Sequence, residues 1–443
     1  MSDRYIVAVE ISSSKIIASI GTSTVEGRLD VIAIEQESCV DAVRHGIIQN
    51  LEETSVKLQR LLLRLEQTAQ ISPKKIKGVV VGLSGRSLRS LPTEVVRHLA
   101  EDTEIDTEII ESLKASAMRT VVEGPLEVVD AVPRIYKVGK TETYSPKGMI
   151  GNRIEATFDL VVCRQELRRN INRTLPDKLG IRIEGFVVTA LASAYLILTP
   201  DEKRLGCMLV DMGAETTTVT IYKDGCLRYF ATLPMGGRNI TRDITSLHVL
   251  EERAEEIKLQ SGKAIVSESS NLNLSGIKIS DVNKLVVARS EEIVANIVEQ
   301  MEYAGLHESK LPGGIVCIGG ASRLSEMMEL LRRQSNLPVR RGELPRYVAI
   351  NDAKAAKLEY IQVVSVMYAG TTLSDKECVE DPVVEEAPKP TTQTVPPHEH
   401  EREPEREPEK ENKRRGGLFR SFTRRMSELF RNPADDDSDL IDE

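Results

Sequence analysis

Two acidic residues, Glu10 and Asp211, each end an apolar β-like segment and stand before a turn of small or hydroxylated residues. A carboxylate at this place suits Mg²⁺ that is bridged to phosphate oxygens, directly or through water. Small residues let backbone N–H groups approach such oxygens, and hydroxyls add further donors. The pattern predicts a site in which two turns bind a polyphosphate and the two acids bind its Mg²⁺. The turn residues are Ser12, Ser13, Ser14 and Lys15 in the first copy and Gly213, Ala214, Glu215 and Thr216 in the second.

These two segments are copies of one pattern. Residues 7–20 and 208–221 align so that Glu10 falls on Asp211, and each copy gives an apolar strand, an acid, a turn and an alternating second strand. Both continue through another turn into a third β-like segment. We therefore expect two related half-domains that face one cleft. For a single copy, an ordinary hairpin whose acid ends a strand by chance is the alternative interpretation, and the duplication argues against it.

Two glycine clusters follow the second copy. Gly236 and Gly237 lie in LPMGGRNITRDI, and GIVCIGGASRLSEM places a second cluster between an apolar strand and a helix. The second arrangement admits close backbone approach to a nucleoside and brings a helix N-terminus nearby. Glycines of this kind also simply form turns, so the clusters alone leave both interpretations open. The residues of the second cluster are Gly319, Gly320, Ala321 and Ser322.

The segments that would position these residues alternate between two periodicities. Between residues 5 and about 375, β-like stretches such as YIVAVEI and GCMLVDM alternate with helical ones, which is typical of an α/β fold. The clearest helix is expected over Glu52–Gln67. Its apolar residues fall largely on one face, and they are Val56, Leu58, Leu61, Leu62 and Leu65.

Composition excludes several classes of function. The chain has 443 residues, 40% of them hydrophobic, and a formal charge of −9, so it offers no overall attraction for nucleic acid. Six scattered cysteines without a C-x-x-C pair suggest neither a disulfide framework nor a zinc site. The N-terminal residues enter a strand pattern without signal-peptide features, and no apolar run of membrane-spanning length occurs. We expect a cytoplasmic protein whose membrane contact, if any, is peripheral.

The last part of the chain has a different composition. Residues 375–412 carry seven prolines and a dense mixture of Glu and Arg, which predicts an extended linker. Residues 413–432 regain helical periodicity, and an acidic tail occupies 433–443. Seven basic residues against Glu428 give this helix a charge of +6, which is typical of a helix lying in a membrane interface. A helix docked on the protein's own core, or in a partner's groove, is the alternative. The predicted lipid contacts are Leu418, Phe419, Phe422, Met426, Leu429, Phe430, Arg414, Arg415, Arg420, Arg424 and Arg425.

Taken in order, these motifs resemble the actin, sugar-kinase and heat-shock chaperone superfamily, and within it the FtsA family over residues 5–370. The resemblance lies in VAVEISSSKI, HGIIQNLEETSVKLQRLL, VVVGLSGRSLRS, LVDMGAETTTVTIYKDG, LPMGGRNITRDI, AEEIKLQSGKA and GIVCIGGASRL. It implies an actin-like fold, a duplicated ribonuclease H-like, two-lobed ATPase architecture with the FtsA-type inserted subdomain. The implied parts are the first lobe at 1–84 and 166–200, the inserted subdomain at 85–165, and the second lobe at 201–374.

The resemblance also implies ATP and Mg²⁺ as ligands. It places Gly213, Ala214, Glu215 and Thr216 along the phosphates with Gly237 beside them, Glu255 and Lys258 near the sugar and base, and Gly319 to Ser322 along the adenosine. Two features depart from the family pattern. Glu10 and Ser12-Ser13 replace the usual Asp and Gly-Thr, and Ala214 and Glu215 replace glycines. Because a carboxylate at Glu215 repels a triphosphate, we expect ATP to bind with slow or negligible turnover.

The partners implied are further copies of the chain, the C-terminal peptide of the tubulin-like FtsZ, other division proteins and lipids of the cytoplasmic membrane. Self-association uses the inserted subdomain, and the FtsZ site lies around Val286–Tyr303 with Arg289 as a contact. Without the family, Arg289 is interpreted as a solvated helix charge. The implied place of action is the inner membrane face at the division septum. Two alternatives stay open, a small-molecule kinase, for which no catalytic base is found, and a pilus-assembly platform protein, which would lack the terminal anchor.

Overall fold

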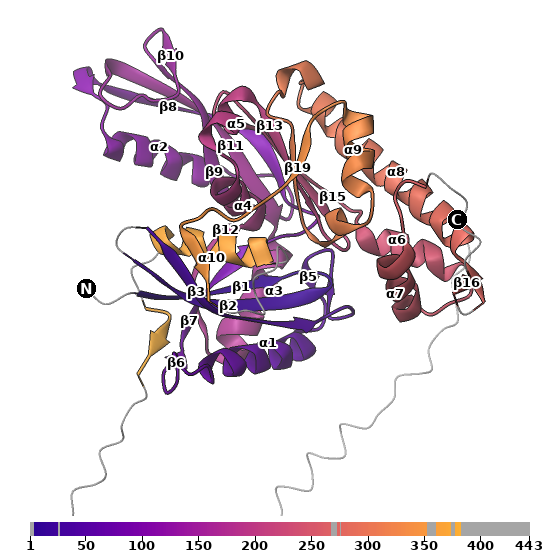
Figure 1. The fold of residues 1–443 in the computed structure, drawn as a ribbon. Helices are drawn as coiled ribbons and strands as arrows, with labels where there is room; N and C mark the ends of the chain where they lie inside the picture. The colour runs from indigo at the N-terminus through magenta and orange to yellow at the C-terminus, as the bar shows by residue number, and fades with distance from the viewer. Residues whose placement is uncertain are drawn as a thin grey trace, which may run out of the picture. The chain divides into compact units, whose positions relative to one another are not determined.

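Two β-sheets form the framework of the computed structural model, which describes residues 4–24, 27–266, 273–274, 276–351, 360–373 and 377–381 (Figure 1). The first sheet has the order β12-β7-β1-β2-β3-β20. Its strands are β12 (Arg182–Val188), β7 (Gly78–Leu83), β1 (Arg4–Ile11), β2 (Lys15–Ser23), β3 (Leu29–Ser38) and β20 (Val348–Ile350). The second sheet has the order β10-β9-β11-β8-β15-β14-β13-β18-β19. Its strands are β10 (Thr141–Thr143), β9 (Leu126–Val138), β11 (Ile150–Arg164), β8 (Arg89–Glu104), β15 (Cys226–Leu233), β14 (Thr217–Lys223), β13 (Cys207–Met212), β18 (Ile315–Ile318) and β19 (Val339–Arg341).

The duplication predicted from the sequence is present in both sheets. In the first, β1, β2 and β3 form an antiparallel meander, with β7 parallel to β1 and β12 parallel to β7. In the second, β13, β14 and β15 repeat the meander, with β18 parallel to β13 and β19 parallel to β18. Glu10 and Asp211 are each the last residue but one of the first strand. The structure thus confirms the alignment of the two copies.

The helix after β3 buries one stripe of leucines against the first sheet. α1 (Leu51–Glu66) begins at Asn50, whose side chain accepts a hydrogen bond from the Glu53 N–H. The leucines predicted to face the core, Leu58, Leu61, Leu62 and Leu65, are buried, but Val56 is 46% exposed. The prediction for Val56 was wrong because it lies two residues before Leu58, and residues two apart point to different sides of a helix.

The helix that covers the other face of this sheet comes from far along the chain (Figure 1). α10 (Ile361–Leu373) packs on β1, β2 and α4 (Thr189–Ile197), and β20 pairs with β3. β20 and α10, which we expected in the second lobe, therefore complete the first. β21 (Val379–Glu380), which lies beyond the expected end of the second lobe at residue 374, also belongs to the first lobe, because it pairs with β6 (Lys75–Ile76). The rest of the expected linker, the terminal helix and the acidic tail lie outside the described residues.

The remaining elements connect and cover these sheets. No helix among those of the described ranges is long and apolar enough to cross a membrane. The other elements of the two lobes are β4 (Val43–Arg44), β5 (Ile47–Ile48), α3 (Gln165–Asn172), the π-helix Arg173–Lys178, α5 (Pro200–Leu205), α6 (Gly237–Thr245), α7 (Glu251–Ser261), β16 (Asn273–Leu274), β17 (Ile277–Lys278), α8 (Ile279–Tyr303), the 3-10 turns Glu308–Lys310 and Gly320–Arg323, and α9 (Met327–Ser335).

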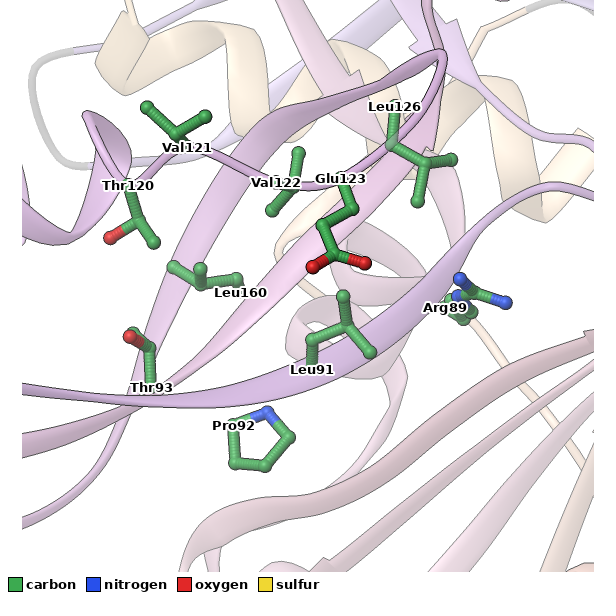
Figure 2. A pocket seen from close by; sticks show the side chains of 10 residues that line it. All are labelled: Arg89, Leu91, Pro92, Thr93, Thr120, Val121, Val122, Glu123, Leu126 and Leu160. Carbon is green, nitrogen blue, oxygen red and sulfur yellow. The ribbon is translucent and has the colours of Figure 1, made fainter.

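An inserted subdomain extends the second sheet. β8, β9, β10 and β11 form it together with α2 (Thr107–Met118), around a core in which Tyr136 packs edge-on against Phe158. It joins β15 through the pairing of Arg89 with Ala231. A pocket of about 310 Å³ lies on this subdomain, between the start of β8 and the segment after α2. Figure 2 shows the side chains that line it. At its rim Val121 is 94% exposed, so this surface offers apolar contact area to a neighbour.

Candidate nucleotide site

The first turn is held by its own hydroxyl groups and by the neighbouring hairpin. Both the N–H and the Oγ of Ser12 donate to the carbonyl of Lys15, at 3.1 and 2.7 Å. Ser13 Oγ accepts from the backbone N–H of Gly46 at 3.0 Å, and the Ser14 carbonyl accepts from Cys39 N–H. Lys15 Nζ donates to Gln36 Oε1 at 3.2 Å. The predicted turn is therefore tied to the β4–β5 hairpin, a partner that the sequence pattern did not indicate.

The second turn packs against the first glycine cluster. Gly213 N–H donates to the Thr216 carbonyl at 2.8 Å and closes the turn. The carbonyls of Gly213 and Ala214 accept from the N–H groups of Gly237 and Arg238, at 3.0 and 2.7 Å. A Cβ atom at Gly236 would lie 2.5 Å from the Gly213 oxygen, so this contact requires glycine. Two motifs that are more than 20 residues apart in the sequence thus form one backbone surface.

Glu10 and Asp211 lie close enough to repel each other. Burial and, to a smaller extent, the Asp211 carboxylate raise the pKa of Glu10 to about 8, against a smaller opposite effect of Lys15. Burial likewise raises the pKa of Asp211 to about 6, and the side-chain amide of Gln362 opposes this by donating to its Oδ1 at 3.0 Å. Glu10 Oε2 is buried without a hydrogen-bond partner. Two crowded acids with an unsatisfied oxygen fit a divalent cation.

The protein does not surround a cation at this place. Within the part of the chain that the structure describes, no three or more His, Cys, Asp or Glu residues come together as a metal site. A cation held by Glu10 and Asp211 would therefore take its other ligands from water or phosphate oxygens. This is the usual environment of Mg²⁺ at nucleotide sites. The donor set fits a magnesium nucleotide.

The second glycine cluster lies beside Asp211. Gly319 has φ +86°, and a Cβ atom there would lie 2.5 Å from Asp211 Oδ1. Gly320 faces open space, with no atom within 4 Å of its would-be Cβ. Ser322 is buried, and its Oγ donates to the Gly319 carbonyl at 2.7 Å. The turn therefore leaves Gly320 open to a ligand while its neighbours fix the backbone.

The residues that the resemblance placed near the sugar and base lie against the same surface. Lys258 is buried, and its Nζ donates to the Gly237 carbonyl at 3.1 Å and to Glu255 Oε2 at 2.6 Å. A Cβ atom at Gly237 would lie 3.1 Å from the Cβ of Ala321. The structure thus brings the two glycine clusters together with α7.

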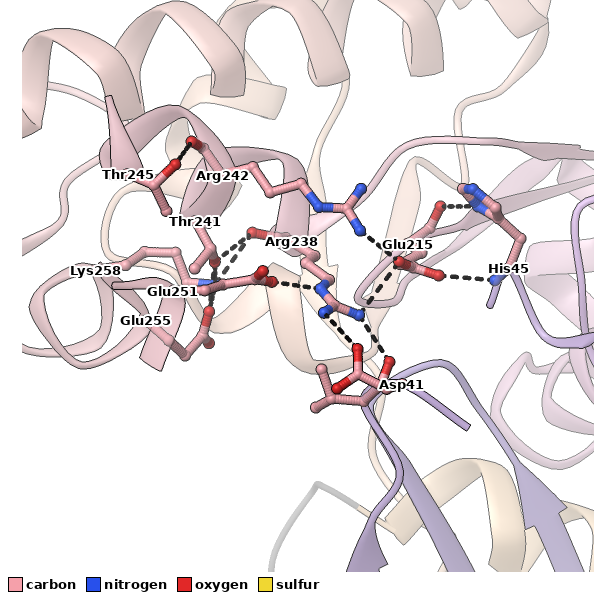
Figure 3. Close-up of polar contacts among 12 residues, drawn as sticks. Asp41, His45, Glu215, Arg238, Thr241, Arg242, Thr245, Glu251, Glu255 and Lys258 are labelled. Atoms are coloured by element: carbon pink, nitrogen blue, oxygen red, sulfur yellow. Dashed lines mark hydrogen bonds and ion pairs between the residues drawn. The ribbon is translucent and has the colours of Figure 1, made fainter. Parts of the chain in front are cut away.

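Glu215 has partners that the sequence analysis missed. We expected an uncompensated carboxylate, but Glu215 is 2% exposed and contacts two arginines and one backbone N–H (Figure 3). The arginines, Arg238 and Arg242, lie one helical turn apart on α6. Their i, i+4 spacing after the glycine pair is the signal that could have revealed them. His45, from the β4–β5 hairpin, supplies the N–H.

Arg289 lies on α8 and contacts α6. Its guanidinium forms a two-pronged ion pair with Asp243 of α6, at 2.6 and 3.0 Å, and a further contact with Glu292. It is half-buried, which differs from the solvated charge expected without the family. Its expected contact with FtsZ stays a prediction.

The raised pKa of Glu10 predicts a pH-dependent stability. We expect the nucleotide-free protein to lose stability as the pH rises from the ordinary pKa of 4.5 to the folded value of about 8. In this window the folded state keeps a proton that the unfolded state has released, so the free energy of unfolding falls with pH, by on the order of 5 kcal/mol in total. Urea denaturation across the window measures the slope. Glu10→Gln cannot ionise and should flatten it, and the same slope in both proteins would contradict the assignment.

The duplicated sheets, the two opposed turns and the acid pair together define a protein of the actin-like ATPase fold. The family profile "Cell division protein FtsA" matches residues 208–364, and "SHS2 domain inserted in FTSA" matches residues 85–162. The chain belongs to the FtsA family.

Relatives agree with this family assignment, and a solved structure agrees with the fold. The chain is 32% identical to the cell division protein FtsA of Porphyromonas gingivalis over 70% of its own length and 66% of that protein. It is 29% identical to the FtsA protein of Pseudomonas aeruginosa, over 77% of this chain and 83% of that one. The PilM-PilN type IV pilus biogenesis complex contains a similar fold, with a TM-score of 0.58 and 18% identity, over 82% of this chain and 98% of that chain.

Proposed function

We propose that this chain binds ATP, assembles with its own copies into actin-like filaments, and tethers FtsZ filaments to the cytoplasmic membrane at the division septum. The observation that carries the proposal is the pair of opposed turns with Glu10 and Asp211 between them, in a chain of the FtsA family. The likeness to PilM extends to the fold only. A small-molecule kinase is disfavoured by the family, and the sequence pattern gives no specific candidate for its catalytic base.

The two turns bind the phosphates in this proposal, and the glycine clusters bind the nucleoside. The N–H groups of the turns face the phosphate oxygens, and Glu10 and Asp211 hold Mg²⁺, which neutralises phosphate charge. Glu255 and Lys258 lie at the sugar and base, and the open side of Gly320 faces the adenosine. Because Glu215 already occupies the donors around it, we still expect slow or negligible turnover. The protein acts as an adaptor.

The protein partners contact two different surfaces. The match of residues 85–162 to the FtsA insertion supports self-association through this subdomain. We place the FtsZ peptide along α8, with Arg289 as a contact whose guanidinium is oriented by Asp243. Other division proteins bind elsewhere on the same filament.

Residues 413–432 anchor the protein to lipid. Burying each large apolar side chain contributes about 1.5–3 kcal/mol, and each basic residue near an anionic leaflet adds roughly 1 kcal/mol. Six apolar residues and a net charge of +6 give a substantial total even after partial burial. The site of action is the inner face of the membrane, and the attachment is peripheral.

Recruitment of FtsZ to vesicles tests this function. With Mg·ATP and vesicles containing anionic lipid, the full-length protein should bring FtsZ polymers into the pellet, whereas FtsZ lacking its C-terminal peptide should stay in the supernatant. Arg289→Ala is expected to lower recruitment several-fold, because it removes a charged contact at the proposed site. Lys284→Ala, on the same helix and exposed, is the matched control. Recruitment that does not depend on the FtsZ peptide would overturn the tethering role.

A further inference from the structure

The buried carboxylate of Glu215 takes the hydrogen bonds that an anion would take. Its Oε2 accepts from the backbone N–H of His45 at 2.7 Å, and its Oε1 accepts from Arg242 at 3.0 Å and from Arg238 at 3.4 Å (Figure 3). One backbone N–H and two guanidinium groups form a donor set typical of phosphate and carboxylate sites. Here the chain's own side chain fills it.

These contacts join the two lobes. Glu215 and both arginines belong to the second lobe, whereas His45 lies in the β4–β5 hairpin of the first. Arg238 Nη1 also donates to the carbonyl of Val40 at 3.0 Å, so a second contact crosses between the lobes. Two further crossing contacts join His45 Nδ1 to the Glu215 carbonyl, at 3.3 Å, and Arg238 to Asp41, at 4.0 Å. Without the contacts that cross between the lobes, Glu215 would only neutralise the arginines of α6 within its own lobe. Because these contacts cross between the lobes, Glu215 also helps to hold the two lobes together.

The first-lobe side of this contact is rigid. Gly46 N–H donates to Ser13 Oγ at 3.0 Å and links the hairpin to the first turn. His45 and Gly46 both have positive φ, of +49° and +80°. A Cβ atom at Gly46 would lie 2.4 Å from the Ser84 carbonyl oxygen, so the hairpin lies tightly against the chain after β7. The first turn, the hairpin, the second turn and α6 are therefore connected by an unbroken series of hydrogen bonds.

We propose that Glu215 acts as a built-in anion that holds the two lobes together when no nucleotide is bound. In this protein, closure of the cleft does not require the phosphates of a ligand. A ligand shifts a conformational equilibrium only by its difference in affinity for the two states. Because the closed state is already favoured, a bound nucleotide changes the arrangement of the lobes little. The two lobes therefore stay closed whether or not a nucleotide is bound.

Hydrogen exchange in the nucleotide-free, full-length protein tests this proposal. The readout is the amide of His45, which is protected only while the contact with Glu215 persists. We expect Glu215→Gly to raise its exchange rate at least tenfold and to increase the radius of gyration measured by small-angle scattering. Glu215→Gln, which keeps the shape and removes the charge, should give a smaller increase of the same sign. Both readouts are taken without nucleotide, so they do not depend on ATP binding.

Glu251→Gln is the matched control. Glu251 also pairs with Arg238, through Nε, but among the described residues its interaction with the first lobe is confined to the charge of Arg44, and it takes no part in the hydrogen bond to His45. Removing the Glu251 charge should leave the exchange rate of the His45 amide unchanged. Unchanged exchange in both Glu215 variants would overturn the proposal, and so would an equal rise in Glu251→Gln. If Glu215→Gly unfolds and raises exchange throughout the chain, Glu215→Gln becomes the deciding variant. A rise at His45 in Glu215→Gln then supports the proposal, and an unchanged rate overturns it.

Discussion

Replacing Gly320 by leucine should weaken ATP binding by roughly 10–100-fold without lowering stability, since forcing a side chain into an occupied site costs about 1–3 kcal/mol. The would-be Cβ of Gly320 meets no atom within 4 Å, so the nucleotide-free protein can accommodate a side chain there. In the proposed complex this open space belongs to the adenosine. The substitution therefore affects the complex and spares the free protein.

Calorimetric titration with Mg·ATP and thermal unfolding together measure this effect. Gly319→Ala is the contrasting variant, because Gly319 has φ +86° and its would-be Cβ lies 2.4 Å from the Met212 carbonyl oxygen. It should lower the melting temperature through strain and contact, whether or not a nucleotide is present. The two variants at adjacent glycines thus distinguish an effect on ATP binding from an effect on folding stability. If Gly320→Leu binds ATP with unchanged affinity, the adenosine does not lie against this turn.

The repeated halves of the fold could be predicted because their information is local. Alignment of residues 7–20 with 208–221 placed Glu10 and Asp211 at equivalent positions, and the antiparallel registers of β1–β2 and β13–β14 agree with it. Strand periodicity and turn residues are set by neighbours in sequence, so they can be read without the tertiary structure. The order of strand, glycine pair and helix around Gly319 and Gly320 was predicted for the same reason.

Features that depend on distant contacts could not be predicted. α10 has apolar residues on most of its faces, including the buried Val363, Val364 and Met367, and such a helix gives no sign of which sheet it covers. Glu215 looked unfavourable beside phosphates because its neutralising groups come from residue 45 and from residues 238 and 242. Its charge could be judged only after the second turn and α6 were placed together, because the arginines lie more than 20 residues further along the chain.

Two acidic substitutions in the terminal segment, Phe422→Glu with Phe430→Glu, are expected to abolish binding to vesicles. In a helix over residues 417–431 both phenylalanines lie on the apolar stripe. Their replacement removes about 1.5–3 kcal/mol of burial for each fully buried ring, and each added negative charge costs roughly 1 kcal/mol more near an anionic leaflet. These residues lie outside those that the structure describes, so the prediction rests on the pattern of the sequence.

A control with the same charge separates the apolar contribution from the electrostatic one. Ser421→Glu with Ser427→Glu adds two negative charges on the polar side of the same helix and leaves the apolar stripe intact. Relative to this control, the phenylalanine variant should bind at least about tenfold more weakly in a pelleting assay, because it alone has lost apolar surface. High salt should reduce the difference between the control and the wild type, because exposed charges are screened, but should not restore the phenylalanine variant. Equal pelleting of the two double variants would assign the attachment to charge alone and would exclude an interfacial helix.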